Sequence, residues 1–152
     1  MLKPRRIIIH HSATEDSRTL SWGAIRRYHT EVNGWKDIGY HAGVECIRDG
    51  YEAIIGRPWV EPGAHTKGEN RDSLGFCFVG NYDAQEPHES MMRVAARSVL
   101  VPWLAIYELD LDRIFGHRDF AAKTCPGRLF DLGKLRDIVA DEARSMMPEP
   151  PA

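Results

Sequence analysis

The sequence predicts a single α/β domain with a central mixed β-sheet and helices packed on its faces. Short apolar runs of strand length alternate with longer segments that have helical periodicity. A turn at Asp49-Gly50 joins two neighbouring strands into a hairpin, so the sheet is expected to be mixed rather than purely parallel. A length of 152 residues fits one domain. We expect residues 1–152 to form that domain, with a core over about 6–146 and a flexible tail at 147–152.

The first predicted elements are a strand and a helix. Residues 6–10 contain three consecutive β-branched isoleucines, which predicts a buried strand. A helix is expected over about 20–32, begun by Thr19 or Ser21 as a cap and ended at Asn33-Gly34. Its apolar positions at helical spacing are Trp22, Ile25, Tyr28 or His29, and Val32.

The middle of the chain predicts the hairpin and a further buried strand. Residues 40–47 and 51–55 are expected to pair, because Asp-Gly supplies the positive φ angles of a tight turn. Residues 58–72 are polar and rich in glycine, which indicates a loop. Residues 74–79 are apolar on both faces and are expected to form a buried strand.

A long helix is predicted over 87–109. One side of it would carry Met92, Ala95, Val99, Trp103 and Ile106. Pro102 lies inside this pattern, and we expect a kink or a break there, since proline removes one backbone hydrogen bond.

The end of the chain predicts a short strand, a loop and a last helix. Residues 113–116 are expected to form the strand, and 125–130 the loop. Asp131 is expected to cap the final helix, which would run to about Met146.

Composition excludes several classes of function. Twenty basic against 22 acidic residues give a net charge of −2, so no nucleic-acid partner is expected. No apolar run reaches the length of a membrane span, so no membrane insertion is expected. The basic start is followed only by Ile7-Ile8-Ile9, too short for a signal peptide, and the chain is expected to be cytoplasmic as synthesised.

Three cysteines, an odd number, indicate free thiols in a reducing compartment. Cys46 and Cys77 lie in strand-like runs and are expected to be core residues. Cys125 lies on a loop beside proline and is the candidate metal ligand.

Two histidines and this thiol have the composition of a zinc site. His10 ends the first strand, and His117 ends the last strand shortly before Cys125. Each residue alone has an ordinary structural interpretation, such as a strand-end histidine bonded to backbone. Together they form a ligand set that leaves one zinc position open, which is typical of a hydrolase that activates water.

Four segments in order carry a resemblance to a known family. They are IIIHHSAT, GWKDIGYH, GAHTKGENRDSLGFCFVGNYD and GHRDFAAKTCPG, and the match runs from about Arg6 to Leu135. The chain resembles the type 2 N-acetylmuramoyl-L-alanine amidases, which include bacteriophage lysozyme-type amidases and peptidoglycan recognition proteins. The resemblance implies cleavage of the amide between the lactyl group of muramic acid and L-alanine. It also implies Zn²⁺ at His10, His117 and Cys125, with cysteine where some members have aspartate.

The resemblance also suggests roles for five further residues. Tyr40 would position the attacking water or relay its proton, whereas its residue type alone fits a tyrosine with a solvated hydroxyl. Lys123 would stabilise the oxyanion, the alternative being a solvated loop lysine. His65, Asn70 and Asn81 are candidates for substrate binding, although a hydrogen-bonded loop histidine and turn-capping asparagines are the alternatives.

Other conspicuous residues are expected outside the chemistry. His11 should point away from the candidate ligands, because side chains alternate along a strand. His29 and His88 are interpreted as structural or exposed. Trp35 is expected in the core, and Trp59 either stacks on sugar or forms core.

The predicted function is therefore a zinc amidase acting on peptidoglycan or muropeptides, as a monomer. A phage or prophage endolysin is favoured, which would act in the periplasm or cell wall once released. The alternatives are a cytoplasmic muropeptide-recycling amidase and a non-catalytic protein that binds peptidoglycan or regulates a polymerase.

Overall fold

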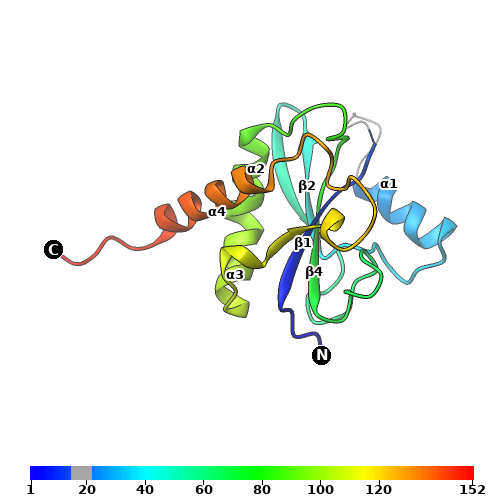
Figure 1. The fold of residues 1–152 in the computed structure, drawn as a ribbon, viewed down its shortest axis with the longest axis horizontal. Helices are drawn as coiled ribbons and strands as arrows, with labels where there is room; N and C mark the ends of the chain where they lie inside the picture. The colour runs from blue at the N-terminus through cyan, green and yellow to red at the C-terminus, as the bar shows by residue number, and fades with distance from the viewer. Residues whose placement is uncertain (15–21) are drawn as a thin grey trace.

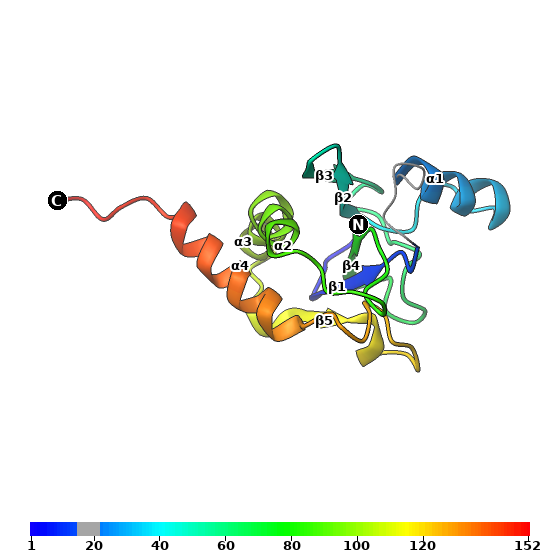
Figure 2. The ribbon, with the colours of Figure 1, turned by 90° about the horizontal axis from the view of Figure 1, so that it is seen from above.

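Five strands form one mixed sheet over the part of the chain that the structure describes. The structure is a computed structural model that describes residues 1–14 and 22–152. The order across the sheet is β3-β2-β4-β1-β5 (Figures 1 and 2). The strands are β1 (Arg6–His11), β2 (Ala42–Ile47), β3 (Gly50–Ile55), β4 (Ser73–Phe78) and β5 (Ile114–Gly116).

The sheet is parallel at its centre and antiparallel at one edge. β1 pairs in parallel with β4 on one side and with β5 on the other. β2 pairs in parallel with β4 and antiparallel with β3, as the hairpin predicted. The carboxyl ends of β4, β1 and β5 therefore meet at the same edge, where a parallel sheet of this kind places its site.

Helices cover both faces of the sheet, as predicted. Figure 2 shows α2, α3 and α4 on one side and α1 on the other. The helices are α1 (Trp22–Arg27), α2 (Glu89–Ala95), α3 (Val101–Tyr107) and α4 (Leu132–Met146). Short 3₁₀ turns, Leu111–Arg113 and His117–Asp119, lie on either side of β5. No helix among the described residues has the length and apolar character needed to cross a membrane.

The two faces bury very different amounts of apolar surface. Ile7 and Ile9 of β1 and Phe76 and Phe78 of β4 belong to the main core, which α2, α3 and α4 complete. The α1 face has only a small cluster, made of Trp22, Ile38, Cys77 and Val79. Because side chains alternate along a strand, His10 lies on the α1 face, where space remains for a site.

The predicted helix over 87–109 is not broken at Pro102. α2 continues through a π-helical turn, Ala96–Leu100, directly into α3. In this wider turn the Val101 N–H bonds to the Ala96 carbonyl, so the irregularity falls just before the proline. The expected position of Ile106 in the core is wrong, since its side chain is 59% exposed. The buried side of α3 is formed by Trp103 with Leu104 and Tyr107 beside it.

A second π-helical turn changes the first helix in the same way. α1 passes into the π turn Tyr28–Val32, and only Trp22 of the predicted apolar stripe is fully buried. Tyr28 and Val32 are 57% and 67% exposed, because the wider turn rotates them away from the sheet. The predicted caps Thr19 and Ser21 lie outside the described residues.

The end of the chain follows the prediction. The Asp131 side chain accepts a hydrogen bond from the Lys134 N–H and caps α4, which ends at Met146. Residues 147–152 are exposed and extend away from the domain (Figure 1). Cys77 is buried as expected, but Cys46 is exposed, because it lies near the hairpin turn, where β2 leaves the packed part of the sheet.

Trp103 and Ile106 provide a matched test of this core. Trp103 is fully buried and packs edge-on against Trp59 and Phe76. We expect Trp103→Ala to lower the free energy of unfolding by about 3–5 kcal/mol through cavity formation. Ile106→Ala on the same helix should change it by less than about 1 kcal/mol. Urea unfolding of both variants checks this, and equal losses would contradict the assigned helix orientation.

Candidate metal centre

His10 lies at the carboxyl end of the central strand. It is 2% exposed and stands opposite Cys77 of β4 in the parallel register. The β-branched residues before it hold β1 between β4 and β5, so the position of its ring is fixed by the sheet itself.

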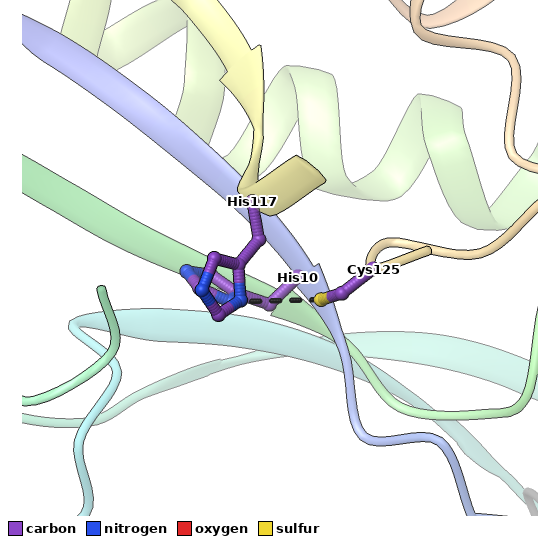
Figure 3. A group of neighbouring side chains, drawn as sticks. All are labelled: His10, His117 and Cys125. Carbon is purple, nitrogen blue, oxygen red and sulfur yellow. Dashed lines mark hydrogen bonds between the residues drawn. The ribbon is translucent and has the colours of Figure 1, made fainter. Parts of the chain in front are cut away.

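His117 and Cys125 reach the same point from later segments. His117 follows β5 directly, in the 3₁₀ turn His117–Asp119, and Cys125 lies on the loop beyond it. One ligand atom from each of the three residues lies within 4.8 Å of the others. His10 Nδ1 is 3.7 Å from Cys125 Sγ, and the two imidazole rings are 4.7 Å apart between centroids (Figure 3). The structure thus brings together the three predicted ligands.

An acidic side chain outside the predicted set anchors the cysteine loop. Asp83 accepts hydrogen bonds from Thr124 Oγ1 at 3.0 Å and from the Arg128 N–H at 2.8 Å. These two contacts lie on either side of Cys125 and hold the loop against the turn that follows β4.

Arg118 holds the same loop from its other side. Its guanidinium donates to the carbonyls of Gly127 and Phe130, at 2.9 and 3.0 Å. Gly127 has a φ of +122° and packs so tightly that a Cβ there would lie 2.5 Å from the Tyr82 carbonyl oxygen. The loop therefore requires glycine at this position.

Burial sets the protonation of all three candidate ligands. Burial lowers the pKa of His10 well below its ordinary value. Neighbours such as His65 and Lys123 add smaller contributions in the same direction. Burial likewise lowers the pKa of His117, and the Lys123 charge adds to this. Burial raises the pKa of the Cys125 thiol to about 11, although a hydrogen bond from the His11 backbone opposes the shift. At neutral pH the cluster therefore holds two neutral imidazoles and a thiol.

Tyr40 lies beside His10, with 5.2 Å between the ring centroids. It precedes β2, which begins at Ala42 rather than at residue 40 as expected. Burial raises the pKa of Tyr40 well above its ordinary value, and the thiols of Cys77 and Cys125 contribute to this. The hydroxyl therefore stays protonated at neutral pH, and in this structure it forms a hydrogen bond with the Cys77 thiol.

A cleft of about 480 Å³ lies over the three donors. Its lining includes Tyr40 and Lys123, the latter from the exposed cysteine loop. His29, Trp35 and Asp83 also line it and were not predicted to do so, and His11 borders it although it was expected to point away from the ligands. Trp35 is 36% exposed, which corrects its expected place in the core. The only sequence signal for it was its position in the segment GWKDIGYH.

A second hollow of about 650 Å³ adjoins this cleft. The two share Trp35, His65 and Lys123, and the second hollow extends to Lys67 and Asn70. Together they form an open depression that extends from the donors toward Lys67 and Asn70.

The predicted substrate-binding residues occupy different positions. His65 is 9% exposed, and its Nδ1 lies 3.0 Å from Nε2 of His10. Asn70 Oδ1 accepts hydrogen bonds from the backbone N–H groups of His65 and Thr66, which shapes the loop. Asn81 Oδ1 accepts from the Asp83 N–H in a turn and is not part of the lining of either hollow. A contact of His65, Asn70 or Asn81 with substrate stays a prediction.

The remaining conspicuous aromatic residues have structural contacts. His11 Nδ1 accepts from the Tyr82 N–H, and His29 Nδ1 accepts from the Gly39 N–H. Trp59 packs on Trp103, which supports core rather than sugar stacking as its role.

The similarity of this chain to known proteins includes all the residues of the candidate site. The family described as N-acetylmuramoyl-L-alanine amidase matches residues 1–128, which include all three candidate ligands. The endolysin of Enterobacteria phage T3 is 40% identical over 138 residues, covering 86% of this chain and 86% of that protein.

Solved structures share the fold. The N-acetylmuramoyl-L-alanine amidase LysC from Clostridium intestinale URNW superposes with a TM-score of 0.77 at 24% identity, covering 91% of this chain and 87% of that one. Peptidoglycan recognition protein-LE, in complex with tracheal cytotoxin (monomeric diaminopimelic acid-type peptidoglycan), gives a TM-score of 0.72 at 31% identity. That match covers 86% of this chain and 78% of the solved chain.

The protonation of the cluster predicts how metal binding depends on pH. The Cys125 thiol must lose its proton to bind a metal ion, whereas the two imidazoles are already neutral. At pH 6 we therefore expect Zn²⁺ binding to release about one proton, and affinity to rise with pH. Calorimetry in buffers of different ionisation enthalpy measures this number. Cys125→Asp, ionised at pH 6, should release fewer protons, and equal release by both proteins would refute the assignment.

Proposed function

The chain belongs to the N-acetylmuramoyl-L-alanine amidase family, and on this basis we propose that it is a zinc-dependent peptidoglycan amidase. The bond cut is the amide between the lactyl group of muramic acid and L-alanine. The observation that carries the proposal is the set of His10, His117 and Cys125 at the floor of an open cleft.

The donor set fits a catalytic zinc ion. Two neutral imidazoles and one thiolate leave a net charge of +1 on the complex and one coordination position open. A zinc ion held in this way supplies an activated water and polarises a carbonyl. Four protein ligands would instead close the site, and no fourth histidine, cysteine or carboxylate joins this cluster among the described residues.

Tyr40 is proposed to orient the reacting groups. Tyr40 lines the cleft, and its protonated hydroxyl, which bonds to Cys77 in this structure, would turn to donate to the attacking water or to the oxygen on which charge develops. The small apolar cluster on the α1 face holds its ring, which limits the positions open to the hydroxyl.

Lys123 is proposed to stabilise the oxyanion. It lies on the exposed loop two residues before Cys125 and lines both hollows. Its charge contributes to the lowered pKa values of His10 and His117, which supports a role for its ammonium group near the three donors. A fixed cation near the scissile carbonyl favours the tetrahedral intermediate over the planar amide.

The biological role proposed is that of a phage or prophage endolysin. The similarity to the phage T3 endolysin along most of both chains supports this role. The substrate is cell-wall peptidoglycan, in keeping with the recognition protein solved with a muropeptide. A peptidoglycan-binding protein without activity would not need the complete ligand set.

Product analysis tests the activity and the role together. Purified sacculi and soluble anhydro-muropeptides are digested separately, and the products are identified by mass spectrometry. We expect free stem peptides beginning with L-alanine, released faster from sacculi than from the soluble fragments. Cleavage at another bond would refute the activity, and a strong preference for the soluble fragments would refute the endolysin role.

Lys123→Ala separates oxyanion stabilisation from metal binding. The variant should retain zinc and thermal stability, because Lys123 is exposed and is not part of the donor set. Its kcat on sacculi should fall by roughly two to three orders of magnitude. Lys134→Ala, an exposed lysine on α4, is the matched control and should retain full turnover. Normal kcat in Lys123→Ala would remove the proposed role.

Tyr40→Phe tests the hydroxyl while keeping the ring. Hydrolysis should fall by about 10²-fold or more, the usual scale for losing a proton-transfer group. Zinc content and melting temperature should stay unchanged. Tyr28→Phe, with an exposed side chain on the neighbouring π turn, provides the control. If Tyr40→Phe cleaves as fast as the wild type, the residue acts only through packing.

A further inference from the structure

The ring of His65 occupies a slot beneath the metal-site residue His10. The two rings meet edge to face with centroids 5.0 Å apart. The slot exists because β4 has glycine at position 75, where a Cβ would lie 2.5 Å from the His65 ring. Asn70 fixes the backbone of this segment by accepting the His65 N–H at 2.9 Å. Contacts with His10, Gly75 and Asn70 thus set the position of this imidazole, which also borders both hollows.

A chain of hydrogen bonds determines which nitrogen of each ring carries the proton. The Ser73 hydroxyl donates to the Glu69 carbonyl at 2.7 Å, and a carbonyl can only accept. Ser73 Oγ is therefore an acceptor toward His65 Nε2, which lies 3.5 Å away. This places the His65 proton on Nε2 and leaves its Nδ1 as an acceptor.

The proton of His10 is located by the same chain of hydrogen bonds. The acceptor Nδ1 of His65 lies 3.0 Å from Nε2 of His10, so His10 carries its proton on Nε2. The Thr66 hydroxyl lies 3.0 Å from His65 Nδ1 and 3.3 Å from His10 Nε2, so it can accept from the His10 N–H while donating its own proton to His65 Nδ1, in keeping with this arrangement. The unprotonated Nδ1 of His10 then faces Cys125 Sγ at 3.7 Å, inside the ligand cluster.

We propose that His65 is a positioning residue that fixes His10 in the tautomer whose Nδ1 lone pair points at the metal. This inference rests on the proposed zinc site, and it gives His65 a role other than contact with substrate. Outer hydrogen bonds of this kind orient a ligating imidazole and raise its basicity, and their loss typically lowers metal affinity by 10–100-fold.

Nitrogen NMR of the imidazoles tests the tautomer directly. Uniformly ¹⁵N-labelled full-length protein is measured at pH 7, both zinc-free and zinc-loaded, with His10 assigned by comparison with His10→Gln. We expect the His10 proton on Nε2 in both forms, and Nδ1 as the zinc-bound nitrogen in the loaded form. A proton on Nδ1 in the zinc-free wild type would overturn the proposal, whatever the variants do.

Two substitutions of His65 then separate positioning from packing. His65→Leu fills the slot but cannot accept from His10, and should lower zinc affinity by about 10–100-fold, with mixed His10 tautomers. His65→Asn places an amide oxygen where Nδ1 lies and should restore affinity and tautomer to near wild type. His88→Leu, at an exposed histidine, controls for the substitution itself.

The outcomes distinguish this inference from the proposed function. Equal zinc affinity and an unchanged His10 tautomer in His65→Leu would overturn the positioning role, even with full amidase activity in the wild type. Equal losses in His65→Leu and His65→Asn would also overturn it, because packing alone would then explain the effect. Failure of the wild type to bind zinc or to cleave peptidoglycan would instead refute the proposed function. The tautomer of His10 in the zinc-free protein could still be measured in that case.

Discussion

The convergence of three chain segments at the carboxyl end of β1 is the constraint on which the site depends. β1 lies between two parallel strands, and Ile7 and Ile9 anchor it in the main core. A register slip of one residue would turn His10 toward the helices on the other face and separate it from the cluster. The apolar packing on one face of the sheet therefore fixes the position of His10 on the other face. The loop that carries Cys125 then brings the thiol to His10.

Burial has opposite consequences for the two kinds of donor. It keeps the imidazoles of His10 and His117 neutral, which suits a metal ligand, but it also keeps the Cys125 thiol protonated. The cluster is therefore uncharged before a metal binds, and no isolated thiolate has to be stabilised in a poorly solvated place. The Cys125 thiol loses its proton only when the metal ion binds. The affinity for the metal ion therefore depends on pH.

Much of the architecture could be predicted because buried strands and turn residues have strong local signals. The β-branched run of β1 and the Asp49-Gly50 turn are examples, and the ligand set followed from residue types together with a family resemblance. The π-helical turns were not predictable, since hydrophobic periodicity assumes a constant helical pitch, and Val32 and Ile106 were therefore misplaced. The anchoring of the cysteine loop by Asp83 was also missed, because nothing in the local sequence indicates a contact over 41 residues.

The central claim is that these three residues form an open zinc site, and X-ray absorption at the zinc edge tests it most directly. The account predicts one sulfur at about 2.3 Å and two imidazole nitrogens at about 2.0–2.1 Å. It also predicts one light-atom ligand that is not from the protein. Cys125→Asp should lose the sulfur contribution and keep both nitrogens. A wild-type spectrum without sulfur, or one that requires four protein ligands, would contradict the account.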